Sequence, residues 1–149
     1  MVWGAISTTG KSQLVIIQGN LTANRYIDIC LRPHLLPFVN QHNQNMQFQH
    51  DNARPHTAIV TRDFLTNNHI NTLPWPALSP DLNPIEHLWD RIDRDVRNQI
   101  VQPRTPHQLA QAVMNAWNQV PQMDIRRLVL SMRRRCTAVV AAQGGHTTY

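Results

Sequence analysis

Two short segments near the start of the chain contain residues that are typical of β-strands. The runs "MVWGAIS" and "SQLVIIQG" flank "TTGK", and this arrangement predicts a β-hairpin. Apolar and polar positions then alternate in "NMQFQHD", where Met46, Phe48 and His50 share one side, so we predict a strand that ends at Asp51. The run "INTLPW" predicts a second short strand, closed by its prolines.

Apolar residues recur at helical steps between these strands. A helical pattern starts at Thr22, and we expect Pro33 and Pro37 to bend or break that helix. The segment "HTAIVTRDFLTNN" predicts another helix. Its expected apolar side consists of Ile59, Val60, Phe64 and Leu65.

The second half of the chain is predicted to be helical. Its most regular pattern follows Asn83 and Pro84, with apolar residues at three- and four-residue steps. That stripe is Ile85, Leu88, Trp89, Ile92 and Val96. A further helix is predicted to start at Thr105–Pro106, and a last helix to carry a run of arginines and to stop at Gly144–Gly145.

The order of these elements predicts an α/β fold, with a mixed sheet and C-terminal helices. The length of 149 residues suits one domain. No apolar run approaches a membrane span, and the N-terminus lacks the layout of a signal peptide, so we expect no membrane association. Cys30 and Cys136 match no metal or disulfide spacing, which favours a reducing intracellular compartment.

The positive charge is concentrated near the C-terminus. The formal net charge is +5, carried by thirteen arginines and one lysine. Five of the arginines fall within ten residues, namely Arg126, Arg127, Arg133, Arg134 and Arg135. Because arginine can bind phosphate through two parallel hydrogen bonds, a nucleic-acid backbone is one candidate partner for this run. A solvated helix face is the alternative interpretation.

Glu86 is the only glutamate in the chain. It lies three residues after Asn83 at a predicted helix start, a pattern typical of a capping box. Asp51 ends a predicted strand, where functional groups of α/β sheets lie. If a tertiary contact joined the two carboxylates, a cation would have to offset their repulsion, and such hard oxygen ligands favour Mg²⁺ or Mn²⁺. Asp81 is predicted to serve the turn before the helix, and the six remaining aspartates to be solvated.

Histidines offer an alternative site. His50, His56 and His87 flank the same two acids, so a zinc site built from histidine and aspartate is conceivable. No pair of histidines has the four-residue spacing of a zinc hydrolase motif. Hydrogen bonding is therefore the default interpretation for each of them.

Four further blocks stand out in order along the chain: "WGAIS", "FQHDNARPHTA", "LPWPALSPDLNPIEHLW" and "GGHTTY". Together they resemble the catalytic domain of Tc/mariner superfamily transposases, the DDE superfamily endonucleases, and the resemblance covers essentially the whole chain. The 34 residues between Asp51 and Glu86 are similar to the family's spacing between its second and third catalytic acids. A glutamate in the last place resembles the Tc branch more than the mariner branch.

This resemblance implies a ribonuclease H-like fold and cut-and-paste transposition of DNA. It gives Asp51 and Glu86 the role of catalytic residues and metal ligands, in a complete site that binds two Mg²⁺ (or Mn²⁺) ions. The implied partner is double-stranded DNA, both transposon ends and target, and the arginine run is the expected DNA-binding surface. A homodimer of the full-length protein and a nuclear location are also expected.

The chain departs from the family pattern at its start. The family's first catalytic aspartate lies on a strand before the "WGAIS" segment, and the only acid in residues 1–50 is Asp28, on a predicted helix. We therefore expect residues 1–149 to be the C-terminal portion of the catalytic domain, without the central strand of its sheet and without a helix-turn-helix domain. DNA cleavage and strand transfer are expected only in a longer chain. The alternative is a catalytically dead, host-retained module for DNA binding or assembly.

Overall fold

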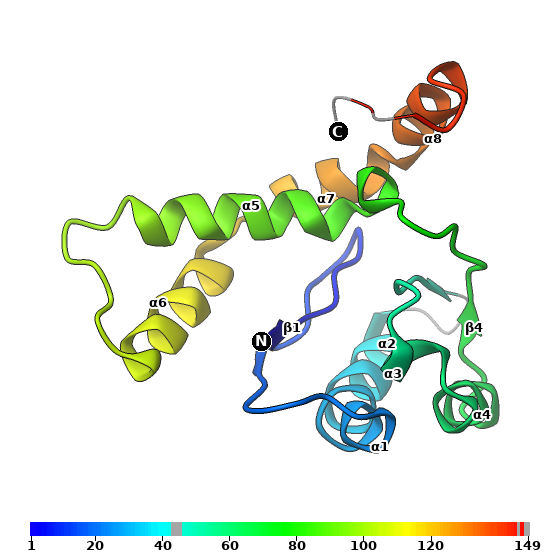
Figure 1. Ribbon diagram of the computed structural model, residues 1–149, viewed down its shortest axis with the longest axis horizontal. Coiled ribbons are helices and arrows are strands. Elements are labelled where there is room, and N and C mark those ends of the chain that lie inside the picture. Colours follow the sequence, from blue (N-terminus) through cyan, green and yellow to red (C-terminus); the bar gives the residue numbers. More distant parts are fainter. Residues whose placement is uncertain (43–45, 146, 148–149) are drawn as a thin grey trace. The chain divides into compact units, whose positions relative to one another are not determined.

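The computed structural model describes residues 1–42, 46–145 and 147, which form two compact units. The first unit consists of Met1–Ala5 and Lys11–Leu78, and the second of Ile6–Gly10 and Ser79–Tyr149. The chain therefore enters the second unit at the tip of its first hairpin, returns to the first unit, and enters the second again at Ser79. Figure 1 labels the α-helices of both units together with β1 and β4.

The strands of the first unit are short and lie in two pairs. β1 (Val2–Trp3) is antiparallel to β2 (Val15–Ile16), which confirms the predicted hairpin. β3 (Gln47–Phe48) is parallel to β4 (Asn71–Thr72), which confirms the second short strand. Over the described residues, the two pairs are separate two-stranded sheets.

The prediction that a strand runs to Asp51 is wrong, because β3 ends at Phe48. The last backbone bond beside β3 is the one from Leu73 N to Phe48 O, at 2.9 Å. Pro74 follows, and a proline has no N–H with which to extend the pairing. Asp51 consequently lies in the loop beyond the strand.

A long helical stretch follows β2. It consists of α1 (Ala23–Tyr26), the π-helix η1 (Ile27–Leu35) and α2 (Leu36–His42), which follow one another directly, so Pro33 and Pro37 do not break the helix. At the end of η1, Leu36 N bonds to Leu31 O, five residues back. In a π-helix each N–H bonds to the carbonyl five residues back, so the carbonyl four residues before Pro33 does not depend on the N–H that proline lacks.

The helix predicted after Asp51 is divided in two. α3 (Arg54–Thr57) and α4 (Ile59–Asn67) meet at Ala58, whose ψ of 144° is extended. Ile59 and Val60 are 68% and 47% exposed, so the expected apolar side is wrong at these positions. The buried positions of α4 are Thr61 and Leu65.

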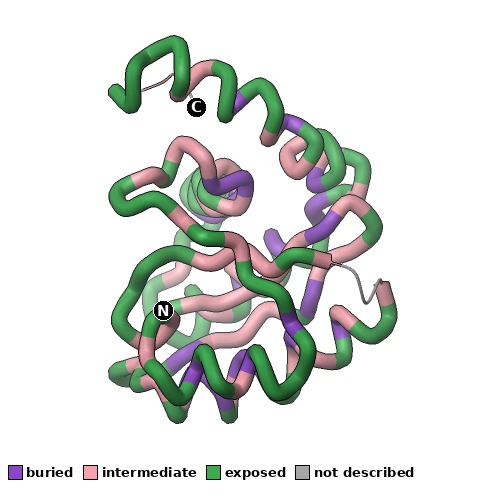
Figure 2. Tube along the Cα trace, turned by 90° about the vertical axis from the view of Figure 1, so that its right-hand side faces the viewer, coloured by how far each residue is buried: buried purple, intermediate pink, exposed green. Residues whose placement is uncertain are grey.

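The core of the first unit lies between its helices and strands. Along α1, η1, α2 and α4, buried positions are interspersed with exposed ones, so that one face of each helix is covered (Figure 2). The buried core residues are Ile17, Tyr26, Ile27, Cys30, Leu31, Leu35, Leu65 and Ile70.

The second unit is helical. The short 3-10 turn η2 (Pro80–Leu82) leads into α5 (Pro84–Arg97), followed by α6 (Pro106–Gln119). Both predicted helices are confirmed, and the stripe of α5 is buried at Leu88, Ile92 and Val96. The Trp89 and Trp117 rings stack with centroids 5.2 Å apart, which joins α5 to α6.

The predicted last helix is instead two helices, α7 (Gln122–Leu130) and α8 (Met132–Ala141). They meet at Ser131, whose hydroxyl donates to Leu128 O at 2.6 Å and so offers the backbone a partner outside the helical pattern. At the start of α7, Gln122 Nε2 donates to Ser7 O at 3.1 Å. This bond ties the hairpin tip to the helical unit.

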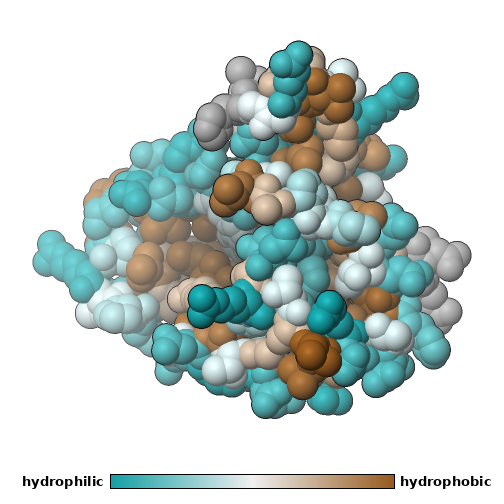
Figure 3. All heavy atoms as spheres, turned by 45° about the vertical axis from the view of Figure 1, so that its right-hand side comes forward, coloured by the Kyte–Doolittle hydropathy of each residue, from teal (hydrophilic) through white to brown (hydrophobic). Residues whose placement is uncertain are grey.

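On the face shown in Figure 3, hydrophilic side chains surround several hydrophobic patches. Within the described part of the chain, every helix is too short or too polar to cross a bilayer.

Candidate functional site

Asp51 is held by the start of α3. Its Oδ1 accepts hydrogen bonds from His56 Nδ1 at 2.6 Å and from Ala53 N at 3.0 Å. Its side chain is 59% exposed, whereas that of His56 is 15% exposed. One carboxylate oxygen is therefore fixed from the protein side while the group as a whole faces solvent.

His56 belongs to a stack of rings in the first unit. Its ring centroid lies 4.4 Å from that of Tyr26 and 5.0 Å from that of His50, with the two imidazole planes 11° apart. Burial, together with the neighbouring His56, lowers the pKa of His50 to about 4, although Asp51 acts in the opposite direction. Burial also raises the pKa of Tyr26. The stack thus supports His56 with rings that are uncharged at neutral pH.

Glu86 lies in the first turn of α5, on the exposed side of the helix. Its Oε1 accepts from Asn83 Nδ2 at 3.2 Å. The capping-box interpretation is wrong, because the Asn83 N–H donates to Pro80 O at 2.8 Å and the Asn83 side chain caps no backbone group. The Asn83 amide instead orients the carboxylate of Glu86.

The two acids belong to different compact units, and their proximity stays a prediction. Each is a hard oxygen donor on a solvent-facing side chain, which is the chemistry that Mg²⁺ and Mn²⁺ prefer. Among the described residues, no group of three or more His, Cys, Asp or Glu side chains is arranged to hold a metal.

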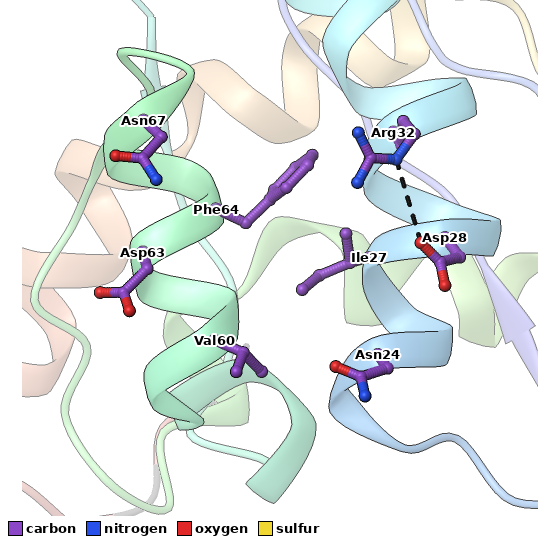
Figure 4. A pocket seen from close by; sticks show the side chains of 8 residues that line it. All are labelled: Asn24, Ile27, Asp28, Arg32, Val60, Asp63, Phe64 and Asn67. Carbon is purple, nitrogen blue, oxygen red and sulfur yellow. Dashed lines mark ion pairs between the residues drawn. The ribbon is translucent and has the colours of Figure 1, made fainter.

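A shallow groove of about 360 Å³ lies between α1–η1 and α4 in the first unit. Figure 4 shows Phe64 and Val60 facing Ile27 across it, with polar side chains around them. Asp28 lies on its edge, in η1 as expected for a helix position, and pairs with Arg32 at 3.9 Å. Arg32 also lies 5.0 Å above the Phe64 ring. Asp28 and Arg32 therefore partly neutralise each other at the edge of the groove.

The five arginines do not share one helix. Arg126 and Arg127 lie on α7, and the other three on α8. Four are exposed, although Arg127 Nη1 lies 3.5 Å from Asp124 Oδ1. Arg135 is only 1% exposed, so its predicted place on a common solvent-facing surface is wrong.

The Arg135 guanidinium is bonded inside the second unit. Its Nε donates to Ser131 Oγ at 2.8 Å, and its Nη1 donates to Asp81 O at 2.6 Å. Its Nη2 donates to His87 Nδ1 at 3.1 Å. Asp81, which is predicted to serve the turn before α5, does so by receiving this arginine at its carbonyl.

The closing "GGHTTY" block also reaches that turn. Thr147 donates to Asp81 Oδ2 from its N–H at 2.8 Å and from its hydroxyl at 2.9 Å. Residues 146, 148 and 149 of the block lie outside the described residues. No sequence signal distinguishes Arg135 or Thr147 as partners of the turn, since their roles depend on contacts over 54 and 66 residues.

Comparison with known proteins places the chain in a family. The DDE superfamily endonuclease family matches residues 1–105. The chain is 36% identical to the Tc1 transposase of Caenorhabditis elegans over all of this chain and 54% of that protein. It is 34% identical to the Tc3 transposase of the same organism, over all of this chain and 45% of that protein. The chain therefore spans about half the length of these curated relatives.

Solved structures show the same fold. The catalytic domain of Mos1 transposase, solved with raltegravir and Mg, matches 98% of this chain and 76% of that chain with a TM-score of 0.84 at 23% identity. A Mos1 strand transfer complex matches 96% of this chain and 43% of that chain with a TM-score of 0.80 at 21% identity. The prediction of a ribonuclease H-like α/β fold with C-terminal helices is confirmed.

The predicted roles of Asp51, Glu86 and the arginines are not tested by these similarities and stay predictions. The family resemblance itself is confirmed over the region that carries both acids. The chain belongs to the DDE superfamily endonucleases and corresponds to the catalytic region of Tc1/mariner transposases.

Proposed function

We propose that this chain forms part of the catalytic centre of a DNA transposase, which cleaves DNA strands and joins transposon ends to a target in a metal-dependent reaction. The observation that carries the proposal is the orientation and exposure of the Asp51 carboxylate. Its Oδ1 is fixed by His56 and Ala53, and its side chain is 59% exposed, so the carboxylate is oriented and accessible. The family match over residues 1–105 supports the same role for Glu86.

In this proposal Asp51 and Glu86 hold Mg²⁺ or Mn²⁺, and the bound metal supplies charge stabilisation at the phosphorus that is attacked. His56 orients Asp51 by donating from Nδ1, and Asn83 orients Glu86 by donating from its amide. Such outer partners fix the direction in which a ligand offers its oxygen. The solved Mos1 catalytic domains with Mg and with Mn are compatible with this donor chemistry.

The exposed arginines of α7 and α8 are proposed to bind the DNA backbone. They are Arg126, Arg127, Arg133 and Arg134. Arg135 is left out because its guanidinium is buried and bonded to protein groups. Transposon ends and target DNA are the proposed partners. A Mos1 paired-end complex with the left transposon end and a Mos1 strand transfer complex, which share this fold, support that proposal. The nucleus is the proposed location.

The metal sites can be tested on residues 1–149 by following Mn²⁺ binding with electron paramagnetic resonance. Asp51→Asn and Glu86→Gln should each weaken binding by at least about tenfold, because each removes a charged ligand. Asp63→Asn on α4 and Asp90→Asn on α5 are matched controls, since both remove an exposed acid. Equal Mn²⁺ affinity in all four variants would refute the assignment.

The reaction itself can be tested in a full-length protein that carries this region. Asp51→Asn and Glu86→Gln should each reduce Mg²⁺-dependent cleavage of a transposon-end duplex by at least about a hundredfold, the rate effect of a few kcal/mol at the transition state. The two control variants should retain the parental rate. Parental cleavage by both Asp51→Asn and Glu86→Gln would overturn the catalytic proposal.

A DNA-binding module without catalysis is the second candidate, and the exposed arginines favour it. Replacing all four by glutamine should lower the slope of log affinity against log salt by up to about four, roughly 0.9 for each phosphate that the protein no longer neutralises. Arg62→Gln on α4 is a control exposed arginine. An unchanged slope would show that the arginine run is only solvated, whereas a lower slope without any metal dependence would favour the second candidate.

A further inference from the structure

We infer that Arg135 is a positioning residue for Glu86, acting through the turn before α5 and through His87. The inference rests on the proposed function, because it concerns the same carboxylate. It separates Arg135 from its neighbours Arg133 and Arg134, which are exposed on the same helix.

The first support is that Arg135 is buried and fully engaged. Its side chain is 1% exposed, and each guanidinium nitrogen donates a hydrogen bond. Removing a charged group from water is unfavourable unless its donors find partners. A guanidinium in this state serves the protein's own structure, whereas binding to phosphate requires exposed donors.

The second support is where those bonds end. Two of them reach residues on either side of Glu86 in the chain: Asp81 O in η2, and His87 Nδ1 in the first turn of α5. Glu86 lies next to His87, and its own N–H donates to Asn83 O at 3.2 Å. Arg135 thus holds both the entry to the helix and the residue after the carboxylate.

The direction of the His87 bond has a chemical consequence. A guanidinium can only donate, so His87 Nδ1 must accept and cannot carry a proton. The ring is therefore held in one orientation and in one tautomer, with its proton on Nε2. Because His87 lies in the first turn of α5, the fixed ring also restrains the backbone of that turn.

A second set of bonds supports the same turn. Thr147 donates twice to Asp81 Oδ2, while Arg135 binds the Asp81 carbonyl. Backbone and side chain of one residue are thus both fixed by segments from the C-terminal part of the chain. These bonds hold the turn in one conformation, and Glu86 follows it in the first turn of α5.

The single glutamate of the chain makes the test specific. In residues 1–149 labelled with ¹³C at the glutamate carboxyl carbon, Glu86 alone should give a resonance. Arg135→Met should shift or broaden this resonance in metal-free protein, and should raise the Mg²⁺ concentration that perturbs it by about tenfold or more. Arg94→Met, at an exposed position on α5 that has no proposed role in binding, should leave both unchanged.

Two further variants keep the test valid if Arg135→Met does not fold. His87→Asn retains an acceptor near the position of Nδ1, and His87→Leu removes it. The asparagine variant should keep the parental resonance and the leucine variant should not. Identical resonances in these two variants, or a parental resonance in folded Arg135→Met, would overturn the inference. Failure of Mg²⁺ to affect the resonance of the parent would instead count against the proposed metal site, and the metal-free comparison would still decide the role of Arg135.

Discussion

The joint between α3 and α4 supports the segment that holds Asp51, and Thr61 is its buried hydrogen-bond donor. Thr61 is fully buried, and its hydroxyl donates to Pro55 O at 2.6 Å. Because Ala58 is extended, α3 ends after a single turn, and Thr61 supplies a bond across the joint. The substitution Thr61→Val replaces the hydroxyl by a methyl group of similar size and leaves the Pro55 carbonyl without this donor.

The expected loss in the free energy of unfolding is about 1–2 kcal/mol. Leaving the Pro55 carbonyl without its donor costs about 2–3 kcal/mol, the upper part of the range for such a loss because Thr61 is fully buried. Burying a methyl group in place of the hydroxyl offsets roughly 1 kcal/mol of this. Thr61→Ser is the matched control, because it keeps the donor and loses one buried methyl, worth about 0.8 kcal/mol.

Urea unfolding followed by far-UV circular dichroism measures both variants, and an unchanged m-value shows that the denatured state is comparable. Amide hydrogen exchange gives a local measurement. In Thr61→Val the His56 amide should exchange faster, because α3 loses its support, and in Thr61→Ser it should not. A Thr61→Val protein as stable as the parent, with unaltered exchange at His56, would refute this reasoning.

Three further predictions concern packing, capping and ionisation. Leu88→Ala should destabilise the protein by about 2–5 kcal/mol in urea unfolding, because Leu88 is fully buried, whereas Leu109→Ala, at a position 48% exposed, should change stability by less than about 1 kcal/mol. Thr105→Ala should cost about 1 kcal/mol by the same measurement, since the Thr105 hydroxyl accepts from Gln108 N at 3.2 Å at the start of α6, and Thr105→Ser should cost little. Burial raises the pKa of Cys30 from 9.0 to about 12, so its contribution to stability is complete below about pH 9 and is lost as the pH rises towards 12, because the unfolded chain releases the thiol proton first. A thiol reagent at pH 8 should therefore modify the exposed Cys136 rapidly and Cys30 only on unfolding, and rapid modification of both thiols would contradict the packing described.

The elements with a strong local signal could be predicted from the sequence. The stripe of α5 and the Thr105–Pro106 start of α6 agree with the structure because periodicity and capping act over a few residues. The end of β3 could not be located, since it depends on Pro74, which follows the partner strand β4 and lies 26 residues after Phe48. The π-helical winding across Pro33 has no sequence signature beyond the proline itself.

The candidate site was predicted by residue type and not by contact. The family resemblance identifies Asp51 and Glu86, but the donors that orient them, His56 and Asn83, emerge only from the folded geometry. Arg135 shows that a run of charged residues in the sequence need not form one exposed surface. Its burial depends on acceptors that lie 48 and 54 residues earlier in the chain.

The division of the first hairpin between the two units has a practical consequence for dissecting this protein. Ile6–Gly10 belongs to the second unit, so that unit is discontinuous along the chain and no single cut separates it from the first. A fragment that starts at Ser79 would lack Ser7, the acceptor of the Gln122 side chain. Split-fragment complementation is therefore the suitable approach: residues 79–149 expressed alone should gain protection from proteases when residues 1–78 are supplied in trans.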